Sequence, residues 1–216
     1  GYSNGTVTAS HNKGAVSSHS TVTTFLGGLV GYIDSKTVVE GSTNAGRIYF
    51  DCPSNTCNMG GLASQVKSGA SVNNCTNSGD VVLANPANNL ACNMGGMIGI
   101  NESQNVANLT NNGNSSGGWS CNSFICLGGV CGFTSKDFTG CINNGKVLFN
   151  ESSTGASGSK LYMGGVVGYT KASITIANCT NTDKGSVSFN PTAQEGDTDR
   201  LYDDIYVGGI LGFSNE

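Results

Sequence analysis

A pair of adjacent glycines recurs six times along this chain, and each pair opens a short apolar box that first reads Gly-Gly-Leu-Val-Gly-Tyr. The first glycines of successive boxes are 33, 35, 33, 36 and 44 residues apart. A repeat of this length is typical of a solenoid, in which neighbouring units must stack to bury a common core. We expect the second glycine of each pair to be structural: Gly28, Gly61, Gly96, Gly129, Gly165 and Gly209.

A column of asparagines lies between the boxes and keeps the same phase. Each precedes a glycine by two residues, except the last, where two further residues separate Asn181 from Gly185. Because Asn and Gly tolerate a left-handed backbone, each Asn-x-Gly predicts a corner of the chain. If the corners stack, the side-chain amides can bond along the stack as a ladder. The corner asparagines are Asn12, Asn44, Asn77, Asn111, Asn143 and Asn181.

Short segments with apolar residues two positions apart flank the corners, as in residues 48–50, 147–149 and 174–176. A period of two places these residues on one face of an extended chain, and no stretch has the spacing of an amphipathic helix. With the box, each unit offers three short strands. We therefore predict an all-β fold, a single parallel β-solenoid domain over residues 1–216, with about six three-sided coils of 33–36 residues.

Composition excludes several classes of protein. The net charge is −4 and the basic residues are scattered, so nucleic acid is not an expected partner. No apolar run approaches the roughly 20 residues of a membrane-spanning helix. The chain starts with Gly1-Tyr2, which looks like the end of a box whose beginning is missing. We expect the chain to be a piece of a longer repeat protein.

The order of segments in the last unit resembles a known repeat. An Ile-Thr-Ile strand, a Cys-Thr-Asn corner, a valine-bearing strand and a Gly-Gly-Ile-Leu-Gly-Phe box follow one another over residues 174–213, and residues 72–81 match the same core. This pattern is similar to the GLUG repeat of secreted and cell-surface bacterial proteins. It covers essentially the whole chain, with departures at Ser64-Gln65 and at residues 114–118, where the usual valine is missing and the unit could be looped out.

The resemblance implies a function as well as a fold. GLUG repeats occur in adhesin-like proteins and as non-catalytic regions of large exported proteins, including a family of immunoglobulin A peptidases. The resemblance therefore implies an extracellular or cell-surface location. It brings no catalytic residues, because the repeat itself has none.

Nine cysteines form an odd number, so at least one thiol remains in any intramolecular pairing. Cys75, Cys131, Cys141 and Cys179 occupy repeat positions that hold small or aliphatic residues in other units, which predicts buried thiols. Disulfides are expected either within short loops or between adjacent coils, whose spacing suits a disulfide. The alternatives are Cys52–Cys57 and Cys121–Cys126 within loops, and Cys57–Cys92 and Cys141–Cys179 between coils.

No constellation of residues predicts catalysis, a metal or a cofactor. His11 and His19 are the only histidines and both lie in the first unit, while Asp and Glu do not recur in register. One acidic cluster lies in the longest interval and is the first candidate for a recognition surface. It consists of Glu195, Asp197, Asp199, Asp203 and Asp204; the loop over residues 85–93 is the second candidate.

These features favour a non-catalytic, rigid scaffold that presents loops to a glycan or protein partner. One alternative is a structural subunit of a surface fibre, in which the exposed ends of solenoids stack on one another. Another is a non-catalytic region of a large exported peptidase.

Overall fold

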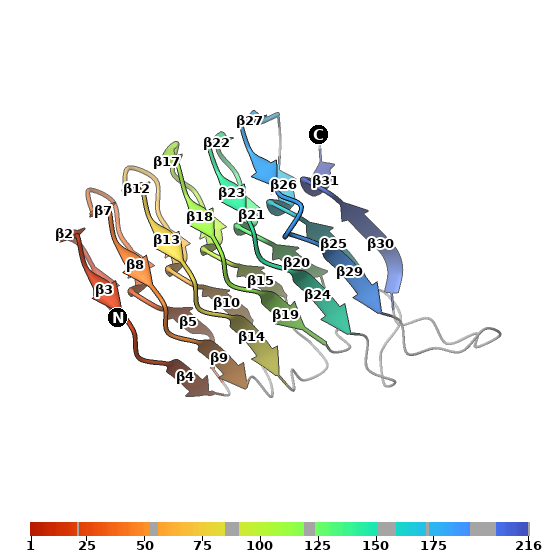
Figure 1. Ribbon diagram of the computed structural model, residues 1–216, viewed down its shortest axis with the longest axis horizontal. Helices are drawn as coiled ribbons and strands as arrows, with labels where there is room; N and C mark the ends of the chain where they lie inside the picture. Colours follow the sequence, from red (N-terminus) through yellow and green to blue (C-terminus); the bar gives the residue numbers. More distant parts are fainter. Residues whose placement is uncertain are drawn as a thin grey trace.

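A computed structural model describes residues 1–20, 22–51, 56–84, 91–118, 124–150, 159–171, 173–190 and 202–215. In these ranges all regular elements are short β-strands, and strands of successive coils pair in parallel. The coils lie side by side along the long axis of the molecule, in chain order (Figure 1). The predicted class, an all-β parallel solenoid, is confirmed.

The strands form five sheets, numbered I to V here in the order in which the chain enters them after each glycine pair. Sheet I holds β1 (Tyr2–Ser3), β6 (Val30–Ile33), β11 (Ala63–Val66), β16 (Ile98–Asn101), β21 (Cys131–Thr134), β26 (Val167–Lys171) and β31 (Leu211–Asn215). Sheet II holds β2 (Thr6–Thr8), β7 (Val38–Glu40), β12 (Ser71–Asn73), β17 (Asn105–Ala107), β22 (Phe138–Thr139) and β27 (Ile176–Ala177).

The remaining three sheets complete each coil. Sheet III holds β3 (His11–Asn12), β8 (Thr43–Asn44), β13 (Thr76–Asn77), β18 (Thr110–Asn111), β23 (Ile142–Asn143) and β28 (Thr180–Asn181). Sheet IV holds β4 (Val16–His19), β9 (Ile48–Asp51), β14 (Val81–Ala84), β19 (Ser115–Gly117), β24 (Val147–Asn150) and β29 (Val187–Asn190). Sheet V holds β5 (Thr24–Gly27), β10 (Cys57–Gly60), β15 (Cys92–Gly95), β20 (Phe124–Gly128), β25 (Ser159–Gly164) and β30 (Tyr202–Gly208).

Each coil thus has five short strands, and the expectation of three strands in each coil is wrong. The strand before each glycine pair belongs to sheet V and the strand after it belongs to sheet I. A residue with a left-handed backbone conformation lies between the strands of sheets II and III. Sheet I has seven described strands and the other sheets have six, so the number of turns differs slightly from the expected six.

The left-handed backbone expected at Asn-x-Gly lies three residues earlier in each coil. Within the described ranges no corner asparagine has a positive φ. The residues three positions earlier do, with φ between 44° and 67°: Ala9, Gly41, Asn74, Asn108, Gly140 and Asn178. The asparagine instead shapes its corner with the side chain, which bonds to the glycine two residues on. Asn77, for example, accepts from the Gly79 N–H at 3.2 Å and donates to the Gly79 carbonyl at 2.7 Å.

The asparagine amides also bond to one another along the stack. The Nδ2 group of each donates to Oδ1 of the next, at 2.7 to 2.9 Å, and the four central side chains are buried. This ladder packs directly against the second glycines: a Cβ at Gly61 would lie 2.4 Å from Asn77 Cγ. The cross-section is therefore pinched to a narrow waist between sheet III and the glycine pair.

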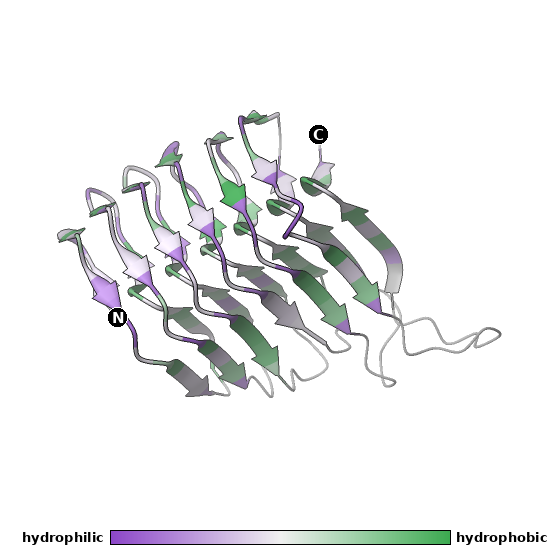
Figure 2. Cartoon of the chain, viewed as in Figure 1, coloured by the Kyte–Doolittle hydropathy of each residue, from purple (hydrophilic) through white to green (hydrophobic). Residues whose placement is uncertain are grey.

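The waist divides the interior into two hydrophobic cores. One lies between sheets IV and V and contains Phe50 and Met59; the other lies between sheets I and II and contains Leu62 and Val72. Apolar segments recur at matching positions of successive coils (Figure 2). The predicted buried thiols follow this pattern, since Cys75, Cys131 and Cys141 are buried and Cys179 is half-buried. Burial raises the pKa of the Cys131 thiol.

The unit that lacks the usual valine still forms its strand. β19 pairs with β14 on one side and β24 on the other, which places Ser115 between Val81 and Val147 in the core. Among the described residues, the Ser115 hydroxyl is the one buried side-chain oxygen or nitrogen without a hydrogen-bond partner. An unsatisfied buried polar group costs about 1–3 kcal/mol.

We therefore expect Ser115→Val to stabilise the protein by about 1–2 kcal/mol, because valine restores the apolar column and removes the unpaired hydroxyl. Urea unfolding monitored by circular dichroism measures the change. Ser116→Val, which adds the same side chain at the adjacent, partly exposed position, is the matched control and should change stability little. A destabilised Ser115→Val variant would contradict the inward placement of this strand.

Candidate binding groove

The outward faces of sheets V and I meet at the glycine pair along a line of outward-pointing side chains, which is called the groove here after the hollow at its amino-terminal end. The ring of Phe25 on β5 contacts that of Tyr32 on β6 edge to face, with centroids 5.5 Å apart. Four coils further on, the Tyr162 ring of β25 stacks on the Tyr169 ring of β26 at 4.9 Å. Side chains that leave the core on two different sheets therefore converge on one line along the molecule.

The third glycine of the box allows this convergence. A Cβ at Gly31 would lie 2.7 Å from the Phe25 carbonyl oxygen, and one at Gly132 would lie 2.6 Å from the Met94 nitrogen. The second box has Ser64 at this position, and its hydroxyl donates to the Asn58 carbonyl at 2.7 Å. The departure from glycine is therefore accommodated by a buried hydrogen bond.

Strand register aligns the groove side chains in two columns. The column on sheet V is Phe25, Asn58, Asn93, Cys126, Tyr162 and Tyr206. The column on sheet I is Tyr2, Tyr32, Gln65, Ile100, Phe133, Tyr169 and Phe213. Aromatic residues occupy both ends of the groove, and amides dominate its middle.

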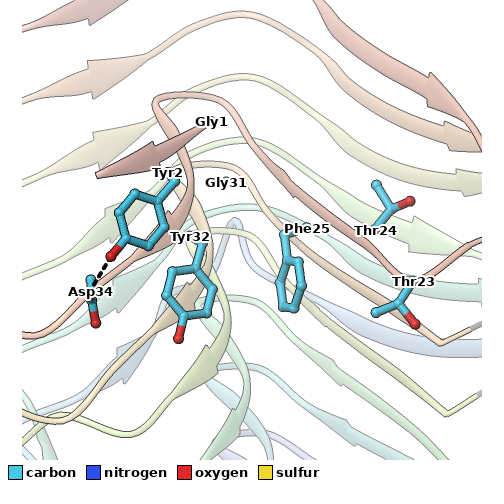
Figure 3. Close-up of a pocket in the computed structure, with 8 residues that line it drawn as sticks. All are labelled: Gly1, Tyr2, Thr23, Thr24, Phe25, Gly31, Tyr32 and Asp34. Carbon is cyan, nitrogen blue, oxygen red and sulfur yellow. Dashed lines mark hydrogen bonds between the residues drawn. The ribbon is translucent and has the colours of Figure 1, made fainter. Parts of the chain in front are cut away.

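The amino-terminal end of the groove is a hollow of about 580 Å³, lined by Tyr2, Phe25, Tyr32 and Asp34 among others (Figure 3). Tyr2 stacks on Tyr32 with centroids 5.6 Å apart, and its hydroxyl donates to the Asp34 carboxylate. This hydrogen bond raises the pKa of Tyr2 and lowers that of Asp34. Tyr2 is 63% exposed and Phe25 is 39% exposed, so the hollow offers ring surface to a ligand.

The carboxy-terminal end of the groove is a cluster of four rings. Tyr162 stacks on Tyr169, on Phe213 at 5.1 Å and on Tyr206 at 5.6 Å. Tyr162 is buried by its neighbours, which raises its pKa, while the other three rings are partly exposed. Phe133 extends the stack by one coil through Tyr169, at 5.5 Å.

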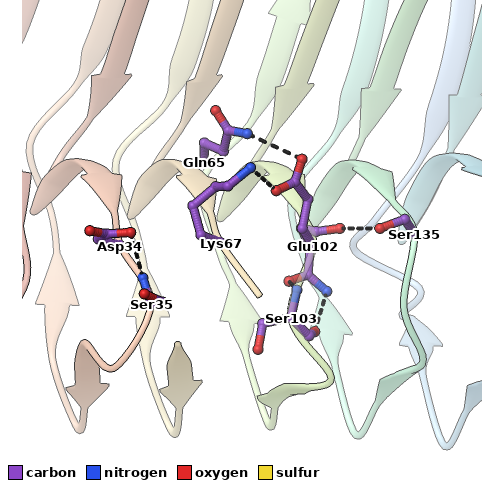
Figure 4. A network of polar contacts seen from close by, with 8 residues as sticks. Asp34, Ser35, Gln65, Lys67, Glu102, Ser103 and Ser135 are labelled. Carbon is purple, nitrogen blue, oxygen red and sulfur yellow. Dashed lines mark hydrogen bonds and ion pairs between the residues drawn. The ribbon is translucent and has the colours of Figure 1, made fainter. Parts of the chain in front are cut away.

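Polar side chains occupy the middle of the groove. The Asn93 amide donates to Asn58 Oδ1 at 2.9 Å, and both side chains are buried in the sheet V column. On sheet I, Gln65 and Lys67 both point to the Glu102 carboxylate (Figure 4), Gln65 through a 3.3 Å hydrogen bond and Lys67 through an ion pair. The hydrogen bond from Lys67 raises the pKa of that amine.

The acidic cluster predicted as a recognition surface is not described as a whole. Glu195, Asp197 and Asp199 lie outside the described residues, and so does the side chain of Asp203. Asp203 and Asp204 belong to β30, so they lie in a strand and not in the long connection. Asp204 forms an ion pair with Lys160 of β25 at 2.9 Å. Residues 85–90 of the second candidate loop also lie outside the description, while Cys92 and Asn93 lie in β15.

Both histidines contact a polar side chain of the adjacent coil. His11 Nδ1 contacts Thr43 Oγ1 at 2.8 Å, and His19 Nδ1 contacts Asp51 Oδ2 at 3.1 Å, both at exposed positions. In the same ranges no group of three His, Cys, Asp or Glu side chains could hold a metal ion. No described helix is long and apolar enough to cross a membrane.

Two of the loop cysteines also lie outside the description. Cys52 and Cys121 are not described, so the pairings Cys52–Cys57 and Cys121–Cys126 stay predictions. Cys57 contacts a different cysteine: its sulfur lies 2.8 Å from the sulfur of Cys92 in the adjacent coil.

Sequence reasoning missed the groove, although a signal for it is present. The sixth box position is aromatic in four of six units, at Tyr32, Phe133, Tyr169 and Phe213. A second aromatic precedes three of the glycine pairs by two residues, at Phe25, Tyr162 and Tyr206. No protein-family model matches this chain, and no curated protein or solved structure matches it.

Proposed function

We propose that this chain is a non-catalytic, adhesin-like repeat module that is secreted or held at a cell surface, and that its groove binds a glycan. The observation that carries the proposal is the pair of outward columns, in which partly exposed rings lie at both ends and Gln65 provides a partly exposed amide between them. The similarity of residues 174–213 to the GLUG repeat supports the adhesin-like class and the extracellular location.

A sugar chain fits the chemistry of this groove. Sugar rings offer C–H faces that pack on aromatic rings, and hydroxyl groups that bond to amides and carboxylates. Both kinds of partner are present, with Tyr2, Phe25 and Asp34 at one end and Gln65 in the middle. Five coil spacings separate Phe25 from Tyr206, or about 24 Å at roughly 4.8 Å per coil, which accommodates several sugar units.

The rest of the fold supports a scaffold role. The asparagine ladder and the two cores fix each coil on the next, so the groove side chains are held in register without an ordering cost on binding. Chain segments between the sheets, including the acidic connection before β30, remain a second candidate surface for partners.

Replacing Tyr2 and Phe25 together by alanine is expected to weaken glycan binding by about tenfold or more, because both rings lose their contact with the sugar. A glycan array identifies the ligand, and titration calorimetry measures the affinity. Ile142→Ala is the matched control, since Ile142 is a similarly exposed apolar side chain, 38% accessible, on sheet III.

A variant with Glu195→Gln, Asp197→Asn and Asp199→Asn separates the two candidate surfaces. If the groove is the site, this variant binds as the wild type does. Loss of binding in this variant and not in the Tyr2→Ala, Phe25→Ala double variant would assign the ligand to the acidic connection. The absence of any glycan that binds the wild type would overturn the proposal.

End-to-end assembly is a second candidate function, favoured by apolar side chains at the last coil. Ile205 and Val207 align with the buried Leu161 and Met163 of the preceding coil, yet they are 41% and 48% exposed. A further coil would cover them, whether it belongs to the same polypeptide or to a second copy that stacks on this end. Light scattering over a range of concentrations tests the idea: growth in mass with concentration supports stacking, and a constant monomer mass contradicts it.

A further inference from the structure

We propose that the two coil-to-coil cysteine pairs, Cys57 with Cys92 and Cys141 with Cys179, are sites of disulfide cross-linking that staple successive coils together. The cross-link forms when a low-molecular-weight or protein disulfide oxidises each pair. Both staples would connect one coil to the next by a covalent bond, in addition to the hydrogen bonds, ion pairs and packing that join the described coils.

The positions of Cys57 and Cys92 support a cross-link between them. Cys57 and Cys92 are directly opposite one another in the parallel pairing of β10 with β15. Their side chains both enter the core between sheets IV and V, and the two sulfur atoms are 2.8 Å apart. Neighbouring strands lie about 4.8 Å apart, within the roughly 4.4–6.8 Å that a disulfide allows between Cα atoms.

The second pair repeats this arrangement in the other core. Cys141 and Cys179 each immediately precede a strand of sheet III, and the next residues, Ile142 and Thr180, are opposite one another in the pairing of β23 with β28. The Thr180 N–H also donates to the Cys141 carbonyl at 2.9 Å, which fixes the register at the cysteines themselves. The pair is therefore aligned in the same coil-to-coil manner as Cys57 and Cys92.

The protonation states of the second pair suit thiol–disulfide exchange. The Cys141 side chain lowers the pKa of the Cys179 thiol, and Cys179 in turn raises the pKa of Cys141. In the reduced structure the Cys141 thiol donates to the Thr139 carbonyl at 3.3 Å and the Cys179 thiol donates to the Ala177 carbonyl at 3.3 Å. The titratable group that faces Cys179 is Cys141, and Cys131 of sheet I is the other thiol near Cys141. Cys179 is half-buried, so part of its side chain reaches the solvent, and its lowered pKa favours the reactive thiolate.

The oxidation of Cys141 and Cys179 by a disulfide RSSR proceeds in two exchange steps. The Cys179 thiolate attacks one sulfur of RSSR, a mixed disulfide forms and RS⁻ leaves. Cys141 then loses its proton, and its sulfur attacks the Cys179 sulfur and releases the second RS⁻. The two cysteines are oxidised and RSSR is reduced to two thiols. At Cys57 and Cys92 both sulfurs are buried, so the same steps take place before the core closes.

Two other buried cysteines provide an internal control. Cys75 lies between Ser42 and Leu109 of the adjacent coils, and Cys131 lies between Ile98 and Val167. Neither therefore has a cysteine at the matching position of the next coil. Under the proposal, both remain thiols while the two pairs are oxidised.

The test is a disulfide map of the full chain refolded with oxidised and reduced glutathione, blocked with iodoacetamide in denaturant and digested without reduction. Because the test supplies the oxidant, it does not depend on the proposed location of the protein. Trypsin releases residues 137–146 and 172–184 with one cysteine each. A second protease is needed to separate Cys57 from Cys52, and to separate Cys92 from the other cysteines of residues 68–136. We expect the linked peptides Cys141–Cys179 and Cys57–Cys92, and alkylated Cys75 and Cys131.

Thermal melting gives an independent readout. The oxidised wild type should melt about 5 °C or more above protein prepared in dithiothreitol. A variant with Ser at Cys57, Cys92, Cys141 and Cys179 should show no difference between the two preparations, whereas Cys75→Ser should retain it. Alkylation of all four cysteines after oxidation, or a Cys52–Cys57 link in place of Cys57–Cys92, would overturn the proposal.

The reduced protein offers a test that does not require the cross-link to form. Iodoacetamide should modify Cys179 first, and the rate of this reaction should rise through a midpoint below the pH at which an ordinary cysteine titrates, because the thiolate is the reactive form and the pKa of Cys179 is lowered. Cys141→Ser removes the thiol that stabilises the thiolate and should move this midpoint upward. A midpoint that is the same in both proteins would contradict the contact between the two thiols.

Discussion

Gly61→Ala is expected to destabilise the protein by more than about 3 kcal/mol, because an added methyl group has no space at the waist. The new Cβ would lie 2.2 Å from the Gly96 carbonyl oxygen and 2.4 Å from Asn77 Cγ. One of these atoms is backbone of the next coil and the other belongs to a buried rung of the ladder. Neither atom can move without separating two coils or breaking the hydrogen bonds of the asparagine ladder, so the clash cannot be relieved by a small local shift. Urea unfolding measures the loss.

Gly209→Ala is the matched control for this prediction. Gly209 is the second glycine of the last box, and a Cβ there would meet no atom within 4 Å. Its substitution should change the free energy of unfolding by no more than about 0.5 kcal/mol. Equal losses in the two variants would show that the clash at the waist is not the cause.

Asn77→Ala is expected to cost about 2–4 kcal/mol, because a fully buried amide that makes four hydrogen bonds is removed. Its Oδ1 accepts from Asn44 Nδ2 at 2.8 Å and from the Gly79 N–H at 3.2 Å, and its Nδ2 donates to Asn111 Oδ1 at 2.9 Å and to the Gly79 carbonyl at 2.7 Å. Alanine leaves the Gly79 peptide groups unsatisfied inside the structure. Thermal and urea unfolding both report the effect.

Asn12→Ala separates the ladder from the corner. Asn12 bonds to both peptide groups of Gly14 but makes only one described bond along the stack, and it is partly exposed. Water can replace part of the hydrogen bonding that this side chain provides, so the free energy of unfolding should fall clearly less than in Asn77→Ala. If the two variants lose the same stability, the central position of Asn77 in the ladder has no energetic consequence.

The sequence was sufficient to predict the stacked coils and the bonded asparagines. The reason is that each depends on a residue type that recurs in phase, with Gly61 and Asn77 in one coil and Gly96 and Asn111 in the next. The number of strands could not be predicted in the same way. The left-handed residue that separates sheets II and III is alanine, glycine or asparagine in different coils, as at Ala9, so no single residue type marks it.

The groove could not be predicted because it depends on an angle between two sheets. The alternation around each glycine pair shows that Phe25 and Leu26 face opposite ways, but it does not show that the outward face of sheet V meets that of sheet I. Only the close approach at the third glycine, such as Gly31 to the Phe25 carbonyl, establishes that. The loop prediction relied on charge alone, and Asp204 turned out to lie in a strand with Lys160 as its ion-pair partner.

The most direct test of the stacked coils is nuclear magnetic resonance of the side-chain amides in the ladder. We predict nuclear Overhauser effects between the amide protons of Asn44, Asn77, Asn111 and Asn143 in that order, and slow exchange of these protons with water, because each amide is buried and bonded to the next. Rapid exchange without any effect between successive asparagines would contradict the stacking on which both the waist and the groove depend.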